Sequence, residues 1–412
     1  MKEKACGIFI FFVVLIAASA NAGGEYSGFV DTYHSFRTKE PDDTLTSRTR
    51  LRLELNMESE SIFLFASVNA EKNYVLSDET GVELHEGYLD YISDQWDMRI
   101  GRQIIIWGKA DGIQITDIIC PPDYTEFITR DLDEIRMPVD AVKFRLLGDA
   151  VNTEMIWIPF FKGAVLPSSG NPWYISPKFP NSTNVLFKKT RKPKKKLKNS
   201  EIAGKLSFYS SGIDIALSAF YTWNDFPSMH RTVKHYDDNK TTITFKPKHH
   251  RLTVFGLEFS KSWDEFVFRG EAAFYKGKYF EPKNLFDTLL KKNSLNWLLG
   301  VDWYPGNDWT ITTQFTDRFI LGYSHRIKEG EHEMISTLNV SKELLRETLR
   351  LSNMIYYSIN NRDLLNRISA EYALTDEFHI SGGADVFSGD KDGRFGRYRD
   401  NTQVWIKAKY SF

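Results

Sequence analysis

Cysteine is almost absent from this chain of 412 residues, which has only Cys6 and Cys120. Because Cys6 lies in an N-terminal segment with the features of an export signal, the exported chain would keep one thiol and could form no internal disulfide. An excess of charge is also lacking, since 53 Lys and Arg stand against 54 Asp and Glu. This balance gives no attraction to nucleic acid.

Long hydrophobic runs are lacking as well. Beyond the N-terminus no segment approaches the uninterrupted apolar length, about 18 residues, that a transmembrane helix needs. A transmembrane β-barrel is still allowed. Lipid-facing and lumen-facing residues alternate along its strands, so their composition averages to a polar one.

The N-terminus has the residue order of a secretory signal peptide. Lys2 and Lys4 precede an uncharged run over 5–20, and the A-x-A sequence at 20–22 follows. The run is short for a membrane anchor, and no cysteine follows it that could carry a lipid. We therefore predict that residues 1–22 are a cleaved signal peptide and that residues 23–412 form the mature domain.

Alternation of polar and apolar residues runs through the rest of the chain. In residues 48–58, Arg48, Arg50 and Arg52 fall on one face, and Leu51 and Leu53 fall on the other. A half-buried β-strand produces this period of two. The pattern predicts about 18 strands, with 16–18 as the range. They lie near 26–37, 47–58, 61–73, 82–93, 95–104, 138–148, 150–159, 201–210, 212–224, 250–261, 264–277, 294–304, 307–319, 331–341, 344–358, 362–374, 376–388 and 401–412.

The predicted connections alternate between tight turns and long loops. The turns are short sequences such as ESES, GDA and PGND, and the loops span 38–46, 105–137, 160–200, 225–249, 278–293, 320–330 and 389–400. An even strand number with this alternation is typical of bacterial outer-membrane barrels. We therefore predict an all-β fold, a transmembrane antiparallel β-barrel with long extracellular loops and short periplasmic turns. A soluble β-sandwich or propeller is the alternative, but strands of 10–14 residues fit a tilted membrane crossing better.

Aromatic residues at strand ends support a membrane barrel. Four Trp flank short turns, where an interfacial girdle belongs, namely Trp96, Trp263, Trp303 and Trp309. The chain ends in VWIKAKYSF, which places Tyr410 on the same face as the terminal Phe412. This ending resembles the C-terminal signal that the barrel-assembly machinery recognises, so Tyr410 and Phe412 are candidate assembly residues and the machinery is a candidate partner.

Charged residues suggest how the lumen is filled. The predicted lumen face carries six basic side chains: Arg48, Arg50, Arg52, Arg99, Lys143 and Arg145. Loop 105–137 carries seven acidic ones: Asp111, Asp117, Asp123, Glu126, Asp131, Asp133 and Glu134. An acidic loop folded against a basic wall would narrow the pore and create a transverse field. The alternative is a salt-bridged plug. We favour the constriction.

Nucleotide and metal sites find little support. Gly101 and Gly108-Lys109 suggest a phosphate loop, but six residues separate the glycines and Ala110 follows the lysine, so the spacing and the chemistry both fail. Four histidines lie in or beside loop 225–249, namely His230, His235, His249 and His250. Their spacing fits no metal site, and we expect solvated loop histidines, with no metal and no cofactor.

Two further patterns leave alternatives open. His379 shares a strand face with Ser381 and Asp385, which suggests an outer-membrane hydrolase, although no third group is in place to orient the base. The run KKTRKPKKKLK at 188–198 has eight Lys or Arg in eleven residues. It would suit lipopolysaccharide phosphates at the outer surface, or it is a solvated loop.

The segment from Arg99 to Lys143 resembles a known family. It contains R-x-G-R-Q-x-x-x-W-G-K-x-D-G, then T-D-x-I-x-P-x-D, then D-L-D-E-x-R-x-P. These motifs look like the signature of a large group of Gram-negative outer-membrane barrels, known only as a domain of unknown function or as candidate porins. Members typically have Asn where this chain has Cys120 before the proline. The resemblance implies a barrel and transport, and it implies no substrate.

Together these features predict a passive outer-membrane channel for small solutes, narrowed by loop 105–137, and not an enzyme. A wide barrel of this strand number can enclose an aqueous path. A plugged structural or binding barrel, such as an export partner or surface receptor, is the alternative. Outer-membrane lipid and lipopolysaccharide are expected partners, and a homotrimer is allowed.

Overall fold

A computed structural model describes residues 24–40, 43–127, 130, 132–181, 183–236 and 241–412. The predicted signal peptide, residues 1–22, and the predicted loop residue Asp131 lie outside these ranges. Among the described residues no helix is long and apolar enough to cross a membrane.

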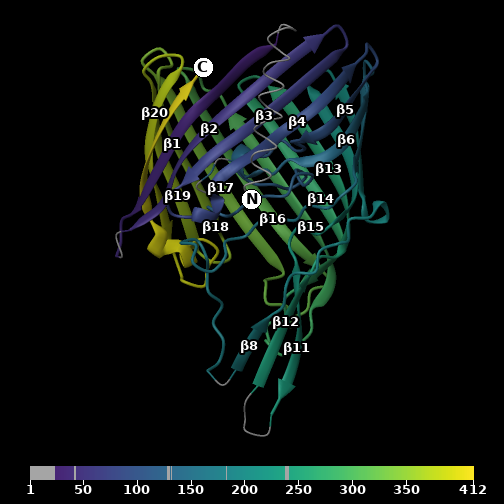
Figure 1. The fold of residues 1–412 in the computed structure, drawn as a ribbon, viewed down its shortest axis with the longest axis vertical. Coiled ribbons are helices and arrows are strands. Elements are labelled where there is room, and N and C mark those ends of the chain that lie inside the picture. The colour runs from purple at the N-terminus through teal and green to yellow at the C-terminus, as the bar shows by residue number, and fades with distance from the viewer. Residues whose placement is uncertain (1–23, 41–42, 128–129, 131, 182, 237–240) are drawn as a thin grey trace.

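Eighteen strands form one closed antiparallel sheet, as predicted (Figure 1). Each strand pairs with its two neighbours in chain order, and β1 closes the ring by pairing with both β2 and β21. The strands are β1 (Glu25–Arg37), β2 (Thr44–Ser59), β3 (Ile62–Asn73), β4 (Gly81–Ile92), β5 (Trp96–Gln103), β6 (Val139–Leu146), β7 (Val151–Ile158), β9 (Glu201–Ser210), β10 (Ile213–Trp223), β13 (Arg251–Trp263), β14 (Phe266–Phe280), β15 (Leu290–Trp303), β16 (Trp309–Leu321), β17 (His332–Leu344), β18 (Leu349–Ser358), β19 (Asp363–Ala373), β20 (Phe378–Ser388) and β21 (Gln403–Ser411).

The period of two in the sequence becomes two faces of the sheet. On β2, Arg48 and Arg50 are buried at 1% and 2% exposure. On β10, Leu217 and Tyr221 are about half exposed, at 48% and 50%. The barrel therefore has a polar inner face and an apolar outer face. Closure leaves no unpaired sheet edge, so the backbone groups of the wall are satisfied within the wall.

The two ends of the barrel differ in their connections. Turns at one end are short, as at 60–61, 211–212 and 264–265, and we call this the short-turn end. The start of β1 and the C-terminus lie there, where Gly28 and Phe412 exchange two backbone hydrogen bonds of 2.9 and 3.0 Å. Figure 1 shows the short turns at the top and the long loops at the bottom.

The long loops contain a second sheet that the alternation did not predict. Strand β8 (Thr183–Phe187) pairs parallel with β12 (Thr241–Lys248), and β12 pairs antiparallel with β11 (Ser228–His235). The sequence pattern predicts only loops over 160–200 and 225–249, so this sheet is a difference between prediction and structure. The described residues outside the wall strands also form three short helices, namely η1 (Ser77–Glu79), η2 (Leu197–Asn199) and η3 (Gly396–Asn401), and one helical turn, α2 (Leu132–Ile135), between β5 and β6.

Candidate functional site

The connection between β5 and β6, residues 104–138, is here called the lumen loop. It leaves the wall at the point where the alternation stops in the sequence. Gly108 and Gly112 have φ angles of +88° and +70°, which favour glycine. A Cβ atom at Gly112 would lie 2.2 Å from the Tyr356 hydroxyl, so a larger residue there would require the Tyr356 side chain to shift.

The first half of the lumen loop is fixed to β14 by a single carboxylate. Glu271 is 4% exposed and accepts hydrogen bonds from the backbone N–H groups of Lys109, Ala110 and Thr116 and from the Thr116 hydroxyl. The Thr116 bonds measure 3.0 and 2.8 Å. One buried wall side chain thereby satisfies four donors of a loop that has few backbone partners of its own.

Neighbouring wall residues hold the same half of the loop. The Arg269 guanidinium, also on β14, is 2.6 Å from Asp111 and donates to the Lys109 carbonyl. Gln314 on β16 accepts from the Asp111 N–H at 3.1 Å and donates to the Asp111 carbonyl at 2.8 Å. Residues 109–116 are therefore fixed by both backbone and side-chain bonds.

The second half of the lumen loop is fixed to β2. Glu126 pairs with Arg48, and Glu134 lies 2.8 Å from Arg50. Burial acts to raise the pKa of Glu126, but Arg130 and Arg48 outweigh it, so the pKa of this carboxyl lies below its usual value. The pKa of Glu134 is also lowered, because Arg50 and Lys407 outweigh its burial. Both carboxyls are therefore charged near neutral pH.

The two anchors lie on opposite walls. Counted along the paired strands, β14 is the ninth strand after β2 in a ring of 18. A segment bonded to the inner faces of both must cross the lumen. Asp31 on β1 completes this second anchor, since its carboxylate lies 2.7 Å from Arg50.

Apolar side chains pack the same loop against the wall between the anchors. Ile105, Trp107 and Cys120 are buried with Ile156 and Phe220, which lie on β7 and β10. The Trp107 indole N–H also donates to Glu154 at 2.6 Å. The Cys120 thiol accepts from the Ile105 N–H at 3.2 Å, and burial raises its pKa to about 12. This thiol is structural and unreactive.

Three of the six predicted pore-lining basic residues have acidic partners on the wall that sequence reasoning missed. Arg99 lies 2.6 Å from Asp90, and Arg145 lies 2.7 Å from Asp97. In each pair the two residues face each other on adjacent strands of the wall. Asp90 and Arg99 lie on β4 and β5, and Asp97 and Arg145 lie on β5 and β6. The wall is therefore locally neutral at these points rather than a continuous basic surface.

The other basic residues of the predicted pore-lining set make different contacts. Arg52 donates to the Asn69 side chain at 2.7 Å. Lys143 pairs in register with Arg99 across β5 and β6, and it is partly buried. Arg48 and Arg50 are the two members of the predicted set that meet the lumen loop.

Three further loop acids from the predicted set bond within the loop itself. Asp117 lies 2.7 Å from Arg136 and is buried, and its pKa is raised because burial outweighs the charge of Arg136. Asp133 pairs with the same arginine but is 86% exposed. Asp123 accepts from the Thr125 N–H at 2.8 Å. Of the described loop acids, Asp111, Glu126 and Glu134 reach the wall.

A second connection, residues 159–200, also folds over the opening. Trp173 is 1% exposed and packs with Phe127 of the lumen loop at 5.6 Å between ring centroids. Phe387 on β20 and Tyr398 join the same cluster. The Asn171 side chain donates to the Thr125 carbonyl at 2.7 Å. The two loops therefore support each other on the side of the barrel formed by β19 and β20.

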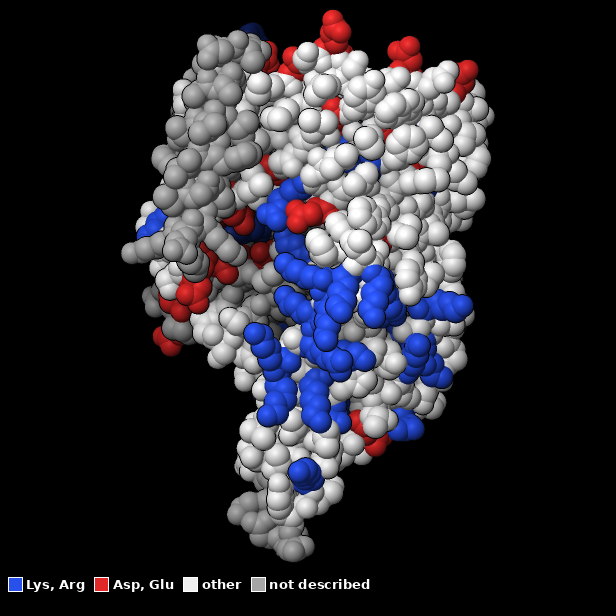
Figure 2. All heavy atoms as spheres, turned by 45° about the vertical axis from the view of Figure 1, so that its right-hand side comes forward, with Lys and Arg blue, Asp and Glu red and all other residues white. Residues whose placement is uncertain are grey.

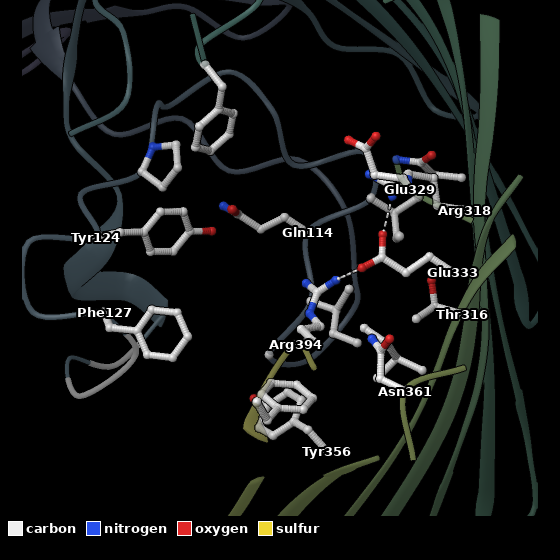
Figure 3. Close-up of a pocket in the computed structure, with 18 of the residues that line it drawn as sticks. Gln114, Tyr124, Phe127, Thr316, Arg318, Glu329, Glu333, Tyr356, Asn361 and Arg394 are labelled. Atoms are coloured by element: carbon white, nitrogen blue, oxygen red, sulfur yellow. Dashed lines mark hydrogen bonds and ion pairs between the residues drawn. The ribbon is translucent and has the colours of Figure 1, made fainter. Parts of the chain in front are cut away.

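A vestibule of about 1100 Å³ remains at the long-loop end, beside the lumen loop. Tyr124 and Phe127 line one side, and Gln114 points into the cavity between them and the opposite wall (Figure 3). On that wall Glu333 bonds to Arg318 and, at 2.6 Å, to Arg394. An aromatic side faces a charged side, so the vestibule can hold a small polar or amphipathic solute.

The arrangement suggested for a hydrolase is not formed by the described residues. The two ring nitrogens of His379 contact Glu371 at 3.2 Å and the Asp376 carbonyl at 3.3 Å, and neither contacts Ser381. Asp385 is engaged by Arg367 at 2.9 Å. Within the described ranges no group of three or more His, Cys, Asp or Glu could hold a metal ion.

The four loop histidines separate into a pair and two others. His230 and His250 lie with their Nε2 atoms 2.6 Å apart, and His250 packs on Tyr279. His249 contacts the Asn224 carbonyl, and His235 contacts Thr241. The pair joins the β11–β12 hairpin to the wall.

The candidate assembly residues lie on the outer face of the closing strand. Tyr410 and Phe412 are 50% and 51% exposed. Trp405 and Lys407 pair in register with Ser35 and Tyr33, whose side chains are buried on the inner face. The terminal strand therefore shows the two faces expected from its sequence.

Comparison with known proteins adds a family and a fold. The family model described as "Protein of unknown function (DUF1302)" matches residues 31–412. A search of curated proteins gave no significant match.

Among solved structures, the chain is similar to OccAB4 of Acinetobacter baumannii, with a TM-score of 0.54 and 10% identity over 94% of this chain and 98% of that one. It also resembles the outer membrane channel DcaP of Acinetobacter baumannii, with a TM-score of 0.47 and 10% identity over 94% of this chain and 97% of that one. It is also similar to OmpTdeltaL8, a loop L8 deletion mutant of OmpT, an outer membrane protein of Vibrio cholerae. The TM-score is 0.47 and the identity 10%, over 94% of this chain and 99% of that one. At this identity, the likeness to OccAB4 shows the fold alone.

Proposed function

The chain belongs to the DUF1302 family of proteins of unknown function, and we propose that it is an outer-membrane channel for small solutes whose lumen is narrowed by residues 104–138. The apolar outer face of a closed 18-strand barrel supports a membrane location. The long-loop end is then extracellular, and the short-turn end is periplasmic.

The observation that carries this proposal is the fixing of the lumen loop to opposite walls. Glu271 holds one half to β14, and Arg48 holds the other half to β2. A loop held in this way sets the width of any path through the barrel and cannot be displaced by a passing solute. Solutes would meet the vestibule first and then pass beside the loop.

The ion pairs of the loop acids favour a constriction that works differently from the transverse field predicted from the sequence. Glu126 and Glu134 are neutralised by Arg48 and Arg50, so these charges fix the loop rather than create a field across an open pore. The selectivity of the path would instead come from side chains that face the vestibule, such as Gln114 and Arg394. The proposed role is transport without a chemical step.

A plugged barrel is the second candidate. The burial of Trp173 between the two loops favours it, because this contact closes one side of the opening. In that case the loops would serve as a receptor or an attachment surface. The difference between the two candidates is whether solute passes through the intact protein.

Liposome swelling tests the proposal. Purified full-length protein is reconstituted, and swelling is followed with sugars of increasing size, with heat-denatured protein as the control. The channel predicts swelling with the smallest sugars and a sharp size limit. Absence of swelling with every sugar would overturn the proposal and favour the plugged barrel.

A further inference from the structure

A field of basic side chains lies on the outer surface near the long-loop end (Figure 2). Its centre is the basic segment, residues 188–198, in which all eight Lys and Arg are exposed. No ion pair within the described chain involves any of these eight. The charge is therefore available to an external anion.

Neighbouring strands extend this field. The Arg191 N–H donates to the Pro247 carbonyl at 2.8 Å, and Lys188 donates to Phe245 at 2.9 Å. These backbone bonds place Lys246 and Lys248 of β12 beside the basic segment. The loop sheet thus holds the segment in place as an ordered surface.

The field lies directly beyond two aromatic side chains at the end of β10, Tyr221 and Trp223. Trp223 on β10 donates its indole N–H to the Asn199 carbonyl at 2.9 Å. Arg251 stacks over Trp223 and Tyr221 at 4.3 and 4.6 Å and donates to the Ser200 carbonyl at 2.9 Å. Aromatic residues of this kind mark the boundary between lipid and head groups. The basic segment therefore starts at head-group level.

Apolar side chains are interspersed with the charges. Leu197 is 62% exposed between Lys196 and Lys198, and Phe187 is 53% exposed next to Lys188. An amphiphile would cover both the apolar and the cationic groups, whereas a soluble polyanion would cover only the cations. The basic segment also does not line the vestibule, so it is poorly placed to guide solutes into the lumen.

We propose that the basic segment, with Lys246, Lys248 and Arg251, binds the phosphorylated head group of lipid A in the outer leaflet. Clusters of four to eight Lys or Arg at a membrane surface recognise anionic lipid head groups in this way. The proposal rests on the outer-membrane location given above, but it does not depend on conduction. Conductance of the same variants therefore separates the two proposals.

The test is a binding measurement on full-length protein in neutral detergent. Labelled lipid A with two phosphates is compared with lipid A from which both phosphates have been removed. The triple variant Lys194→Gln, Lys195→Gln, Lys196→Gln is compared with Lys39→Gln, Lys261→Gln, Lys391→Gln, which removes three exposed lysines outside the field.

The proposal predicts that the phosphorylated form binds more tightly and that the first triple variant loses about tenfold or more in affinity. The control variant should bind as the wild type does. Salt at about 0.5 M, which strongly screens surface charges, should weaken the binding of phosphorylated lipid A to the wild type. Equal binding of both lipid forms would overturn the proposal. Displacement of lipid A by inorganic polyphosphate at equal phosphate concentration would also overturn it, in favour of a soluble polyanion.

Discussion

Arg48 of β2 and Glu126 of the lumen loop form an ion pair in which each side chain is only 2% exposed. The Asn73 amide donates to the other Glu126 oxygen at 3.1 Å, and Arg130 lies 3.0 Å from this carboxylate. Removing two charges from water is costly, and the cost is repaid only when the remaining polar atoms are also bonded. Both Glu126 oxygens are bonded, whereas the Arg48 Nε has no hydrogen-bond partner in the described chain. The pair joins the loop to β2 chiefly because loss of either charge would leave the other one buried.

Replacing Glu126 by Gln should loosen this anchor. The change removes the nearer of the two carboxylates that pair with the buried Arg48 and leaves only Glu134, at 3.8 Å. The loss costs on the order of 3 kcal/mol. We expect larger single-channel conductance and more frequent current fluctuations in planar bilayers. Asp133→Asn is the matched control, because it removes the same charge from an exposed position in the same loop. Identical currents from both variants would contradict the role of the pair.

A similar experiment tests the anchor on the opposite wall, Glu271 of β14. Glu271→Gln replaces one of two accepting oxygens by a donor, so some of the four loop donors lose their acceptor at about 1–3 kcal/mol each. We expect faster hydrogen exchange at Lys109, Ala110 and Thr116. Glu258→Gln is the control, since Glu258 pairs in register with Glu271 and bonds to Lys205 instead of the loop. The idea fails if exchange at these amides rises equally in the control.

The β2 anchor should weaken only in strong acid. The folded pKa of Glu126 and of Glu134 lies below the ordinary value of about 4.3. Their contribution to stability is therefore complete above that value and is lost as pH falls through the folded pKa. We expect constant conductance from pH 7 to 5 and an increase only after the pH falls below the ordinary carboxyl value of about 4.3. An increase already complete at pH 5 would mean that other groups hold the loop.

The histidine pair should respond at milder pH. Burial and the nearby Lys248 lower the pKa of His250 to about 4, and the pKa of His230 is also lowered, mainly by burial. The unfolded value is about 6.5, so the docking of β11 and β12 should weaken as pH falls from about 6.5 toward 4. Hydrogen exchange of these strands at pH 7 and 5 measures this. His250→Gln should reduce the effect, because only the smaller contribution of His230 remains. His235→Gln should leave it unchanged.

Deletion of Phe412 should reduce assembly. Its backbone exchanges two hydrogen bonds with Gly28, and its side chain lies on the outer face of the closing strand. We expect less heat-modifiable barrel in the outer membrane, because the assembly machinery would lose its terminal aromatic. Tyr372→Ala, which removes another half-exposed aromatic from the outer wall, is the control. Equal yields of the two variants would argue against a terminal signal.

The strands of the barrel wall were predictable from the sequence, because each strand shows in the alternation of its own residues. Alternation within residues 48–58 and 213–223 requires only neighbouring residues, and all 18 wall strands were located in this way. The break in alternation after Gln103 likewise marked where the lumen loop leaves the wall. The sheet formed by β8, β11 and β12 was missed, because its short strands lie in segments without a sustained pattern.

The anchors were not predictable, because their partners are distant in the chain. Lys109 and Glu271 are 162 positions apart, and only ring closure brings them together. Asp31 and Asp90 were also missed as partners of Arg50 and Arg99. The alternation shows that such residues face inward, but strand register decides which charges meet. The expectation of a basic wall arose from counting one sign of charge.

The most direct test of the account is the conductance of a protein without the lumen loop. Replacing residues 106–136 by a short Gly-Ser turn is feasible, because Gln103 and Val139 already pair across β5 and β6. The wild type should give small current steps in planar bilayers, and the loop-deleted barrel should give clearly larger ones. Equal steps, or no current from either protein, would contradict the claim that this loop controls passage through the barrel.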